Sequence, residues 1–120
     1  MSKLNNILIV EDNRGDAVLL KEYLKECQED IKIDHVTRLI EAIKSITRTE
    51  YDMLFLDLSL PDSEGMETYE LIKIHYEKPI VILTGYPQEV FDSYPENTPT
   101  FLEKGEITPD VLKKLLKQIN

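Results

Sequence analysis

Five short apolar runs alternate with stretches of helical periodicity along the chain, and this alternation restricts the fold more than any other feature of the sequence. The apolar runs cover residues 7–10, 31–36, 53–56, 79–84 and 100–103. Strands that alternate with helices favour parallel pairing, because right-handed crossovers place the helices on both faces of one sheet. We therefore expect an α/β fold, a single three-layer, doubly wound (βα)5 domain with a five-stranded parallel sheet.

The apolar runs also differ from one another in ways that indicate their place in the sheet. Residues 7–10 and 53–56 are apolar throughout, which is typical of strands buried on both faces. Residues 31–36 alternate between apolar and polar, which predicts an edge strand. Pro79 stands only at the start of the fourth run, where its missing N–H is tolerated.

Helical spacing of apolar residues predicts helices over 16–27, 39–46, 66–76 and 109–119. Thr37 is placed to cap the second of these helices, and Thr108 the last, with Pro109 in its first turn. The stretch 85–99 contains three prolines, so we expect at most two helical turns there, over 88–94.

The length and composition suit one soluble domain. The chain has 120 residues, and its 23 acidic and 14 basic residues give a formal net charge of −9. This charge opposes non-specific binding to nucleic acid or to anionic membranes. The single Cys27 excludes an internal disulfide, and no apolar run approaches the roughly 20 residues that would span a bilayer. We expect one domain over residues 1–120, located in the cytoplasm.

Polar side chains stand at the ends of four of the five predicted strands. Glu11 and Asp12 follow the first strand, and Asp57 follows the third. Thr84 ends the fourth strand, and Lys104 follows the fifth. Because the carboxyl ends of parallel strands meet at one edge of a sheet, we expect these side chains to lie together.

These residue types suit phosphoryl transfer. Crowded carboxylates raise one another's pKa unless a cation joins them, and the oxygens of Asp12 and Asp57 are ligands of the kind that Mg²⁺ prefers. Asp57 could act as a nucleophile and form an acyl phosphate, while Lys104 and Thr84 bind the phosphoryl oxygens. Taken singly, each residue has an ordinary structural explanation as a turn, cap or surface residue. Their joint occurrence at four strand ends favours a phosphoryl-transfer site.

Four segments of the chain resemble the response-regulator receiver domains of two-component signalling, including chemotaxis receivers. The segments are Ile7–Asn13 with its acidic pair, Leu56–Gly65 as the phosphorylation loop, Ile82–Gly85, and Phe101–Lys104. Together they are specific, and the resemblance covers essentially the whole chain. It implies the flavodoxin-like strand order 2-1-3-4-5.

The resemblance also implies roles for the residues at the strand ends. Asp57 would be the residue modified by phosphorylation. Asp12, Asp57 and the backbone carbonyl of Ser59 would bind Mg²⁺ or Mn²⁺, with Glu11 close to the metal. Asp57, Thr84 and Lys104 would be the catalytic residues.

Two further residues complete the expected switch. Thr84 would turn toward the phosphoryl group, and Phe101 would move inward with it. Ser59 and Tyr86 occupy the two variable positions that tune dephosphorylation in this family, and the large Tyr86 is expected to slow it. Gly105 stands where most relatives have proline after the lysine, which leaves the shape of that loop open.

The function that the resemblance implies is signalling. The domain would catalyse only its own phosphorylation and dephosphorylation and would not be an enzyme in its own right. The phosphoryl group would come from a sensor histidine kinase or a histidine phosphotransfer protein, and a downstream protein target would bind the switched surface. The chain would be a monomer or a weak dimer, with no nucleic acid or membrane partner.

Other functions remain open at this point. One is a degenerate receiver that acts as an interaction scaffold without phosphorylation. A flavin-binding protein would need a hydroxyl- and glycine-rich loop where 13–16 is acidic, and an aspartate phosphatase would need a second acid where Ser59 stands. His35 and His75 are expected to be ordinary surface histidines.

Overall fold

The structure is a computed structural model, and it describes residues 4–85 and 100–119. The strands of its main sheet are β1 (Asn6–Val10), β2 (Lys32–Val36), β3 (Met53–Asp57), β6 (Ile80–Thr84) and β7 (Thr100–Glu103). The helices are α1 (Arg14–Cys27), α2 (Leu39–Arg48), α3 (Met66–Lys73) and α4 (Pro109–Ile119), and a 3₁₀ turn, η2, covers Lys104–Glu106. The helix expected over 88–94 lies outside the described residues.

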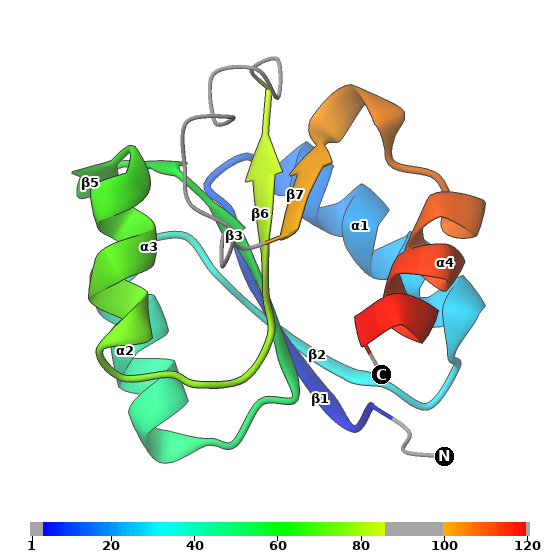
Figure 1. Cartoon of the computed structure of the whole chain (residues 1–120), viewed down its shortest axis with the longest axis horizontal. Helices are drawn as coiled ribbons and strands as arrows, with labels where there is room; N and C mark the ends of the chain where they lie inside the picture. Colours follow the sequence, from blue (N-terminus) through cyan, green and yellow to red (C-terminus); the bar gives the residue numbers. More distant parts are fainter. Residues whose placement is uncertain (1–3, 86–99, 120) are drawn as a thin grey trace.

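The five strands form one parallel sheet in the order β2-β1-β3-β6-β7. Since β6 and β7 are the fourth and fifth strands of this sheet, the order is the predicted 2-1-3-4-5. Helices α2 and α3 cover one face of the sheet, and α1 and α4 cover the other (Figure 1). The predicted three-layer α/β architecture is confirmed. Among the described residues, two further strands, β4 and β5, form a separate two-stranded sheet with each other.

Two apolar cores hold the layers together, one on each face of the sheet. Along β1, Ile7 and Ile9 pack into the core beneath α1 and α4, whereas Leu8 and Val10 pack into the core beneath α2 and α3. This division follows from the two-residue period of a strand. All five residues of β3 are buried, as predicted for a central strand. By contrast, β2 lies at the sheet edge and its residues are all exposed or half-buried, which confirms the edge prediction.

A small antiparallel hairpin between β3 and α3 was not predicted. It pairs β4 (Ser59–Leu60) with β5 (Ser63–Glu64) and begins two residues after Asp57. Gly65 ends the hairpin with a φ of 74°, a conformation that favours glycine, and its N–H donates to the Leu58 carbonyl at 2.8 Å. This bond closes the hairpin one residue after the end of β3.

Helix α3 ends at Lys73, three residues earlier than predicted. The apolar spacing continues to Tyr76, but that side chain is buried by packing beyond the helix. Its hydroxyl donates to the Tyr51 carbonyl at 3.0 Å. The helical spacing of apolar residues therefore continues to Tyr76 because that side chain is buried, although the backbone there is no longer helical.

The caps of two helices also test the sequence predictions. Thr108 caps α4 as expected, because its Oγ1 accepts from the Val111 N–H at 3.2 Å. The prediction that Thr37 caps α2 is wrong. The Thr37 N–H and hydroxyl both donate to the side chain of Glu41. The first amides of α2 donate instead to Asp62, which follows α2 in the sequence.

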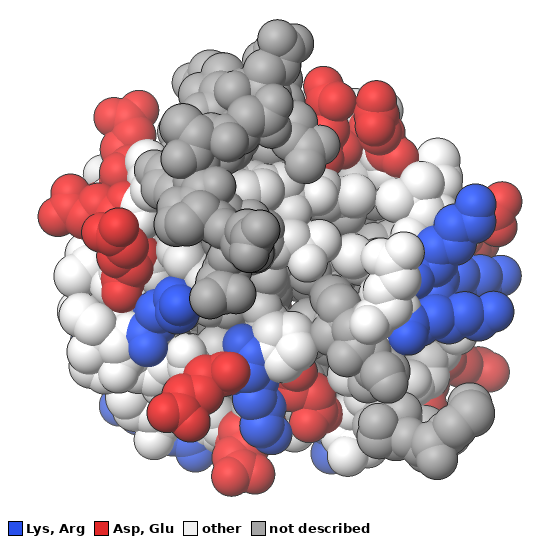
Figure 2. All heavy atoms as spheres, in the orientation of Figure 1, with Lys and Arg blue, Asp and Glu red and all other residues white. Residues whose placement is uncertain are grey.

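The surface carries both signs of charge. Acidic side chains occupy several parts of the face drawn in Figure 2, and a group of basic side chains lies over α4, which carries the exposed Lys113, Lys114 and Lys117. Within residues 4–85 and 100–119, we find no helix with the length and apolarity needed to cross a bilayer.

Candidate functional site

Parallel pairing brings the predicted strand-end residues to one rim of the sheet. Asp57 is the last residue of β3 and pairs with Leu83, so Thr84 lies one residue beyond it at the end of β6. Glu11 and Asp12 continue the chain directly after β1, which is the other neighbour of β3. The spatial arrangement expected from the sequence is therefore present.

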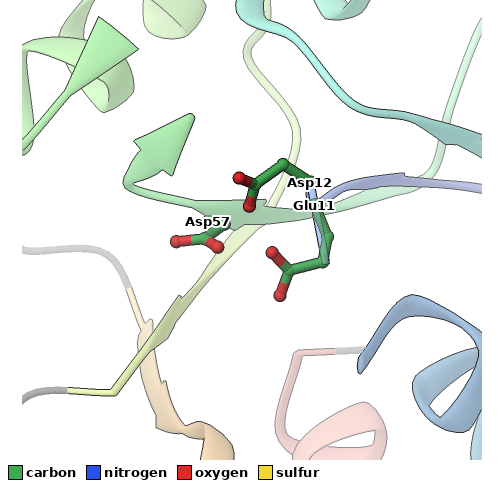
Figure 3. Close-up of side chains that lie close together, drawn as sticks. All are labelled: Glu11, Asp12 and Asp57. Carbon is green, nitrogen blue, oxygen red and sulfur yellow. The ribbon is translucent and has the colours of Figure 1, made fainter. Parts of the chain in front are cut away.

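Three carboxylates form the centre of this rim. One oxygen from each of Glu11, Asp12 and Asp57 can be chosen so that all three lie within 4.8 Å of one another (Figure 3). Glu11 is fully buried, Asp57 is 6% exposed, and Asp12 is exposed to solvent. Such a set of hard oxygen donors, open to water on one side, fits a small divalent cation.

Lys104 supplies the positive charge at the site. Its Nζ lies 2.6 Å from Glu11 Oε1, 2.9 Å from Asp57 Oδ2 and 3.4 Å from Asp16 Oδ2. Burial alone would lower the pKa of Lys104, but its contacts with Glu11 and Asp57 raise that pKa above its ordinary value. Lys104 is therefore positively charged in the folded protein at neutral pH.

The surroundings of Glu11 disfavour its ionised form. Burial and the neighbouring Asp57 raise the pKa of Glu11 to about 8, against the opposing effect of Lys104. Glu11 Oε1 also has no well-aligned hydrogen bond within the described part of the chain. A buried carboxylate with a raised pKa needs a proton or a positive charge beside it, and the Lys104 ammonium, 2.6 Å from Oε1, is the positive charge that the structure places there.

The Asp57 carboxylate is held from two sides. Its Oδ1 accepts a hydrogen bond from the Ser59 N–H at 2.9 Å, and its Oδ2 accepts from Lys104 at 2.9 Å. The family resemblance implied a metal-binding role for the Ser59 carbonyl but not this contact of its amide. The first residue of the β4–β5 hairpin thus orients the side chain of Asp57.

The two expected switch residues occupy different surroundings. Thr84 is 5% exposed at the end of β6. Phe101 is half-buried on β7 and packs against the core beneath α2 and α3. Their roles as a switch remain predictions, and Tyr86 lies outside the described residues. Gly105 lies within the η2 turn, where the peptide bonds are trans.

Two residues beside the site were not predicted to touch it. His35 Nε2 lies 2.7 Å from the Glu11 backbone oxygen, although its side chain is exposed as expected. Asp16 reaches Lys104, 88 residues away. No local pattern could have found either contact, because a histidine on an edge strand and an acid in the first turn of a helix are both ordinary surface residues. His75 is exposed, as predicted.

Fold and site together define a class of protein, an α/β domain with a carboxylate and lysine cluster at the carboxyl end of a parallel sheet. The family model of the response regulator receiver domain matches residues 7–117. The chain belongs to this family of two-component signalling proteins.

Individual relatives agree with this assignment. The chain is 27% identical over 114 residues to a response regulatory protein of Vibrio cholerae, covering 92% of this chain and 48% of the relative. It is 34% identical over 86 residues to the regulatory protein VanR of Enterococcus faecium, covering 72% and 36%. The chain thus spans less than half the length of these curated relatives.

Solved structures are similar over nearly the full chain. A CheY-like receiver domain from Methylobacillus flagellatus matches with a TM-score of 0.80 and 27% identity, covering 98% of this chain and 100% of that one. The BeF₃-activated receiver domain of RstA from Klebsiella pneumoniae matches with a TM-score of 0.81 and 26% identity, covering 96% and 97%.

Proposed function

We propose that this receiver domain accepts a phosphoryl group on Asp57 in a reaction that depends on a divalent cation. The observation that carries the proposal is the position of the Asp57 carboxylate. It is buried between the Ser59 N–H and the Lys104 ammonium, and oxygens of Glu11 and Asp12 lie close to it. A nucleophile held in one orientation beside an ammonium is suited to phosphoryl transfer.

The cation is proposed to be Mg²⁺, with Mn²⁺ as a substitute. Asp12, Asp57 and the Ser59 carbonyl would hold it, and Glu11 would lie close to it. When bound, the cation offsets the negative charges of the carboxylates and of the incoming phosphoryl oxygens. The carboxylate cluster supports this role because its donors are all oxygens and because two of the three are buried.

The remaining steps belong to the side chains of this chain. A carboxylate oxygen of Asp57 attacks phosphorus, the P–N bond of a phosphohistidine donor breaks, and the imidazole leaves with the bond's electron pair. Lys104 moves from its present carboxylate partners to a phosphoryl oxygen, and the Thr84 hydroxyl donates to another. Water then attacks the acyl phosphate, which releases inorganic phosphate and returns the Asp57 carboxylate.

The consequence of phosphorylation is a change of binding surface. The new phosphoryl group adds charge and three acceptor oxygens, which favours the arrangement in which Thr84 and Phe101 have turned inward. A sensor histidine kinase or a histidine phosphotransfer protein would be the donor, and a protein would be the downstream target. In this proposal the domain signals and turns over no external substrate.

Treatment with acetyl phosphate, followed by intact mass spectrometry, tests the proposal. We expect one added phosphoryl group in the presence of Mg²⁺ and none in EDTA. Asp57→Asn should lose the labelling, while Asp110→Asn, at an exposed position on α4, should retain it. A folded wild-type protein that gains no label with Mg²⁺ would instead be a scaffold that works without phosphorylation.

A further inference from the structure

The carboxylate that caps α2 comes from the phosphorylation loop. Asp62 lies in the turn between β4 and β5, and its Oδ1 accepts from the Leu39 N–H at 2.8 Å. Its Oδ2 accepts from the Ile40 N–H at 3.0 Å. The residue at the cap position, Arg38, makes no side-chain cap of its own. Asp62 therefore satisfies two amides of a helix that starts 23 residues before it.

This contact has the strength of a charged cap. A carboxylate at a helix N-terminus is stabilised by the helix dipole in addition to its hydrogen bonds. Slight burial acts in the other direction, but the amides of Ile40 and Leu39 hold the pKa of Asp62 below its ordinary value. Asp62 is thus ionised and bonded at neutral pH.

The hairpin that carries Asp62 also carries the amide that orients Asp57. Ser59 pairs with Glu64 across the hairpin, and the Leu58 carbonyl accepts from the Gly65 N–H at 2.8 Å. These contacts make the hairpin one short, closed unit. A displacement of the turn at Asp62 therefore also displaces Ser59, three residues away.

A second contact fixes the far side of the hairpin. The Ser63 and Thr68 hydroxyl oxygens lie 2.6 Å apart, which joins β5 to the first turn of α3. Thr68 is fully buried. The hairpin is thus anchored to α3 on one side and, through Asp62, to α2 on the other.

We propose that Asp62 is a positioning residue for the phosphorylation site, which couples the start of α2 to the orientation of Ser59 and Asp57. The proposal rests on the function proposed above. There the Ser59 carbonyl binds the metal, while the Ser59 N–H makes its observed hydrogen bond to Asp57. Coupling of this kind is reciprocal, so Mg²⁺ binding must strengthen the bonds from Leu39 and Ile40 to Asp62.

The simpler alternative is a cap that only stabilises the fold. Both alternatives predict a lower melting temperature for Asp62→Ala, because the loss of a cap destabilises a helix. Only the coupled site predicts weaker binding of Mg²⁺ at temperatures where the variant is fully folded. Metal affinity and melting temperature together therefore separate the two.

The experiment uses Mg²⁺ alone as the ligand and backbone NMR of the full chain as the readout. Asp62→Ala should bind Mg²⁺ roughly threefold or more weakly than wild type, since residues that support metal ligands commonly contribute at least that much. Asp62→Asn keeps one carbonyl oxygen and should recover part of the affinity. Glu64→Ala removes an equal charge from the same hairpin, at an exposed side chain that makes no cap, and should change the affinity by less than about twofold.

Amide hydrogen exchange supplies the reciprocal measurement. In wild type, saturation with Mg²⁺ should slow exchange at the amides of Leu39 and Ile40, and this response should be absent in Asp62→Ala. Unchanged Mg²⁺ affinity in Asp62→Ala, with only a lower melting temperature, would overturn the coupling and leave the proposed function intact. Failure of the wild-type protein to bind Mg²⁺ would overturn both.

Discussion

The Lys104 ammonium lies 2.9 Å from Asp57 Oδ2, which joins two residues that are 47 positions apart in the sequence. The same ammonium lies 2.6 Å from Glu11 Oε1. One ammonium thus holds together two carboxylates at the ends of neighbouring strands. This relationship makes Lys104 a competitor of a metal for the same oxygens, and its replacement should have two opposite effects.

Lys104→Met should slow phosphorylation of Asp57 and at the same time tighten the binding of Mg²⁺. Loss of a charged hydrogen bond to the phosphoryl group, worth about 1.5–3 kcal/mol, predicts a decrease in rate of roughly tenfold or more. Mg²⁺ affinity should rise because Glu11 and Asp57 no longer have an internal cation. Acetyl phosphate labelling rates and Mg²⁺ titrations measure the two effects, and weaker binding of both ligands would contradict this account.

Asp12→Asn should remove the stabilisation by Mg²⁺ without harm to the metal-free fold. Asp12 is exposed, and its charge repels Glu11 and Asp57, so the metal-free variant should be as stable as wild type or more so. In wild type, Mg²⁺ at about 100 times its Kd should add about 2.7 kcal/mol to the free energy of unfolding. Thermal melts with and without Mg²⁺ measure this difference. Asp110→Asn, which lies away from the site, is the control and should keep the full increase.

The cap formed by Asp62 should make stability depend on pH in acid. Because the folded-state pKa of Asp62 is lowered, its contribution is present above the unfolded pKa and is lost as the pH falls through the folded pKa. Asp62→Asn should therefore be less stable than wild type at pH 7, by at most about 1 kcal/mol for this exposed position, and equally stable once Asp62 is protonated. Urea unfolding at several pH values gives the comparison. A stability gap that persists unchanged at the lowest pH would show that charge is not the cause.

Tyr76→Phe should destabilise the protein through the loss of one buried hydrogen bond. The Tyr76 hydroxyl donates to the Tyr51 carbonyl, and Tyr76 is buried, with 7% of the residue exposed. Removal of the hydroxyl leaves that carbonyl without this donor, so the free energy of unfolding should fall by about 1 kcal/mol. Tyr23→Phe serves as the control, because the Tyr23 side chain is half-buried and its hydroxyl makes no hydrogen bond within the described residues. Equal effects of the two substitutions would argue against the bond.

The strands and the site rim could be predicted because each depends on a local pattern or on a general rule of topology. The apolar runs mark the strands, and parallel pairing then brings Glu11, Asp57 and Thr84 to one edge. The β4–β5 hairpin could not be predicted in this way, since strands of two residues are too short for any periodicity. The end of α3 was misplaced because burial of Tyr76 continues the helical spacing past the helix.

Contacts between distant residues account for the other errors. Thr37 has the residue type and position of a cap, and only the folded loop shows that Asp62 takes that place. Asp16 likewise meets Lys104 through the packing of α1 beside the end of β7. In both cases the tertiary structure brings the two partners together. Residue propensities and the spacing of apolar residues carry no information about such long-range contacts.

The most direct test of the account is to map the residue that carries the phosphoryl group. After treatment with acetyl phosphate and Mg²⁺, reduction with borohydride converts an aspartyl phosphate into homoserine, which peptide mass spectrometry can locate. We predict homoserine at position 57 alone, and only in samples that contained Mg²⁺. Conversion at position 12 with Asp57 unmodified would contradict the central claim that the buried carboxylate between Ser59 and Lys104 is the phosphoryl acceptor.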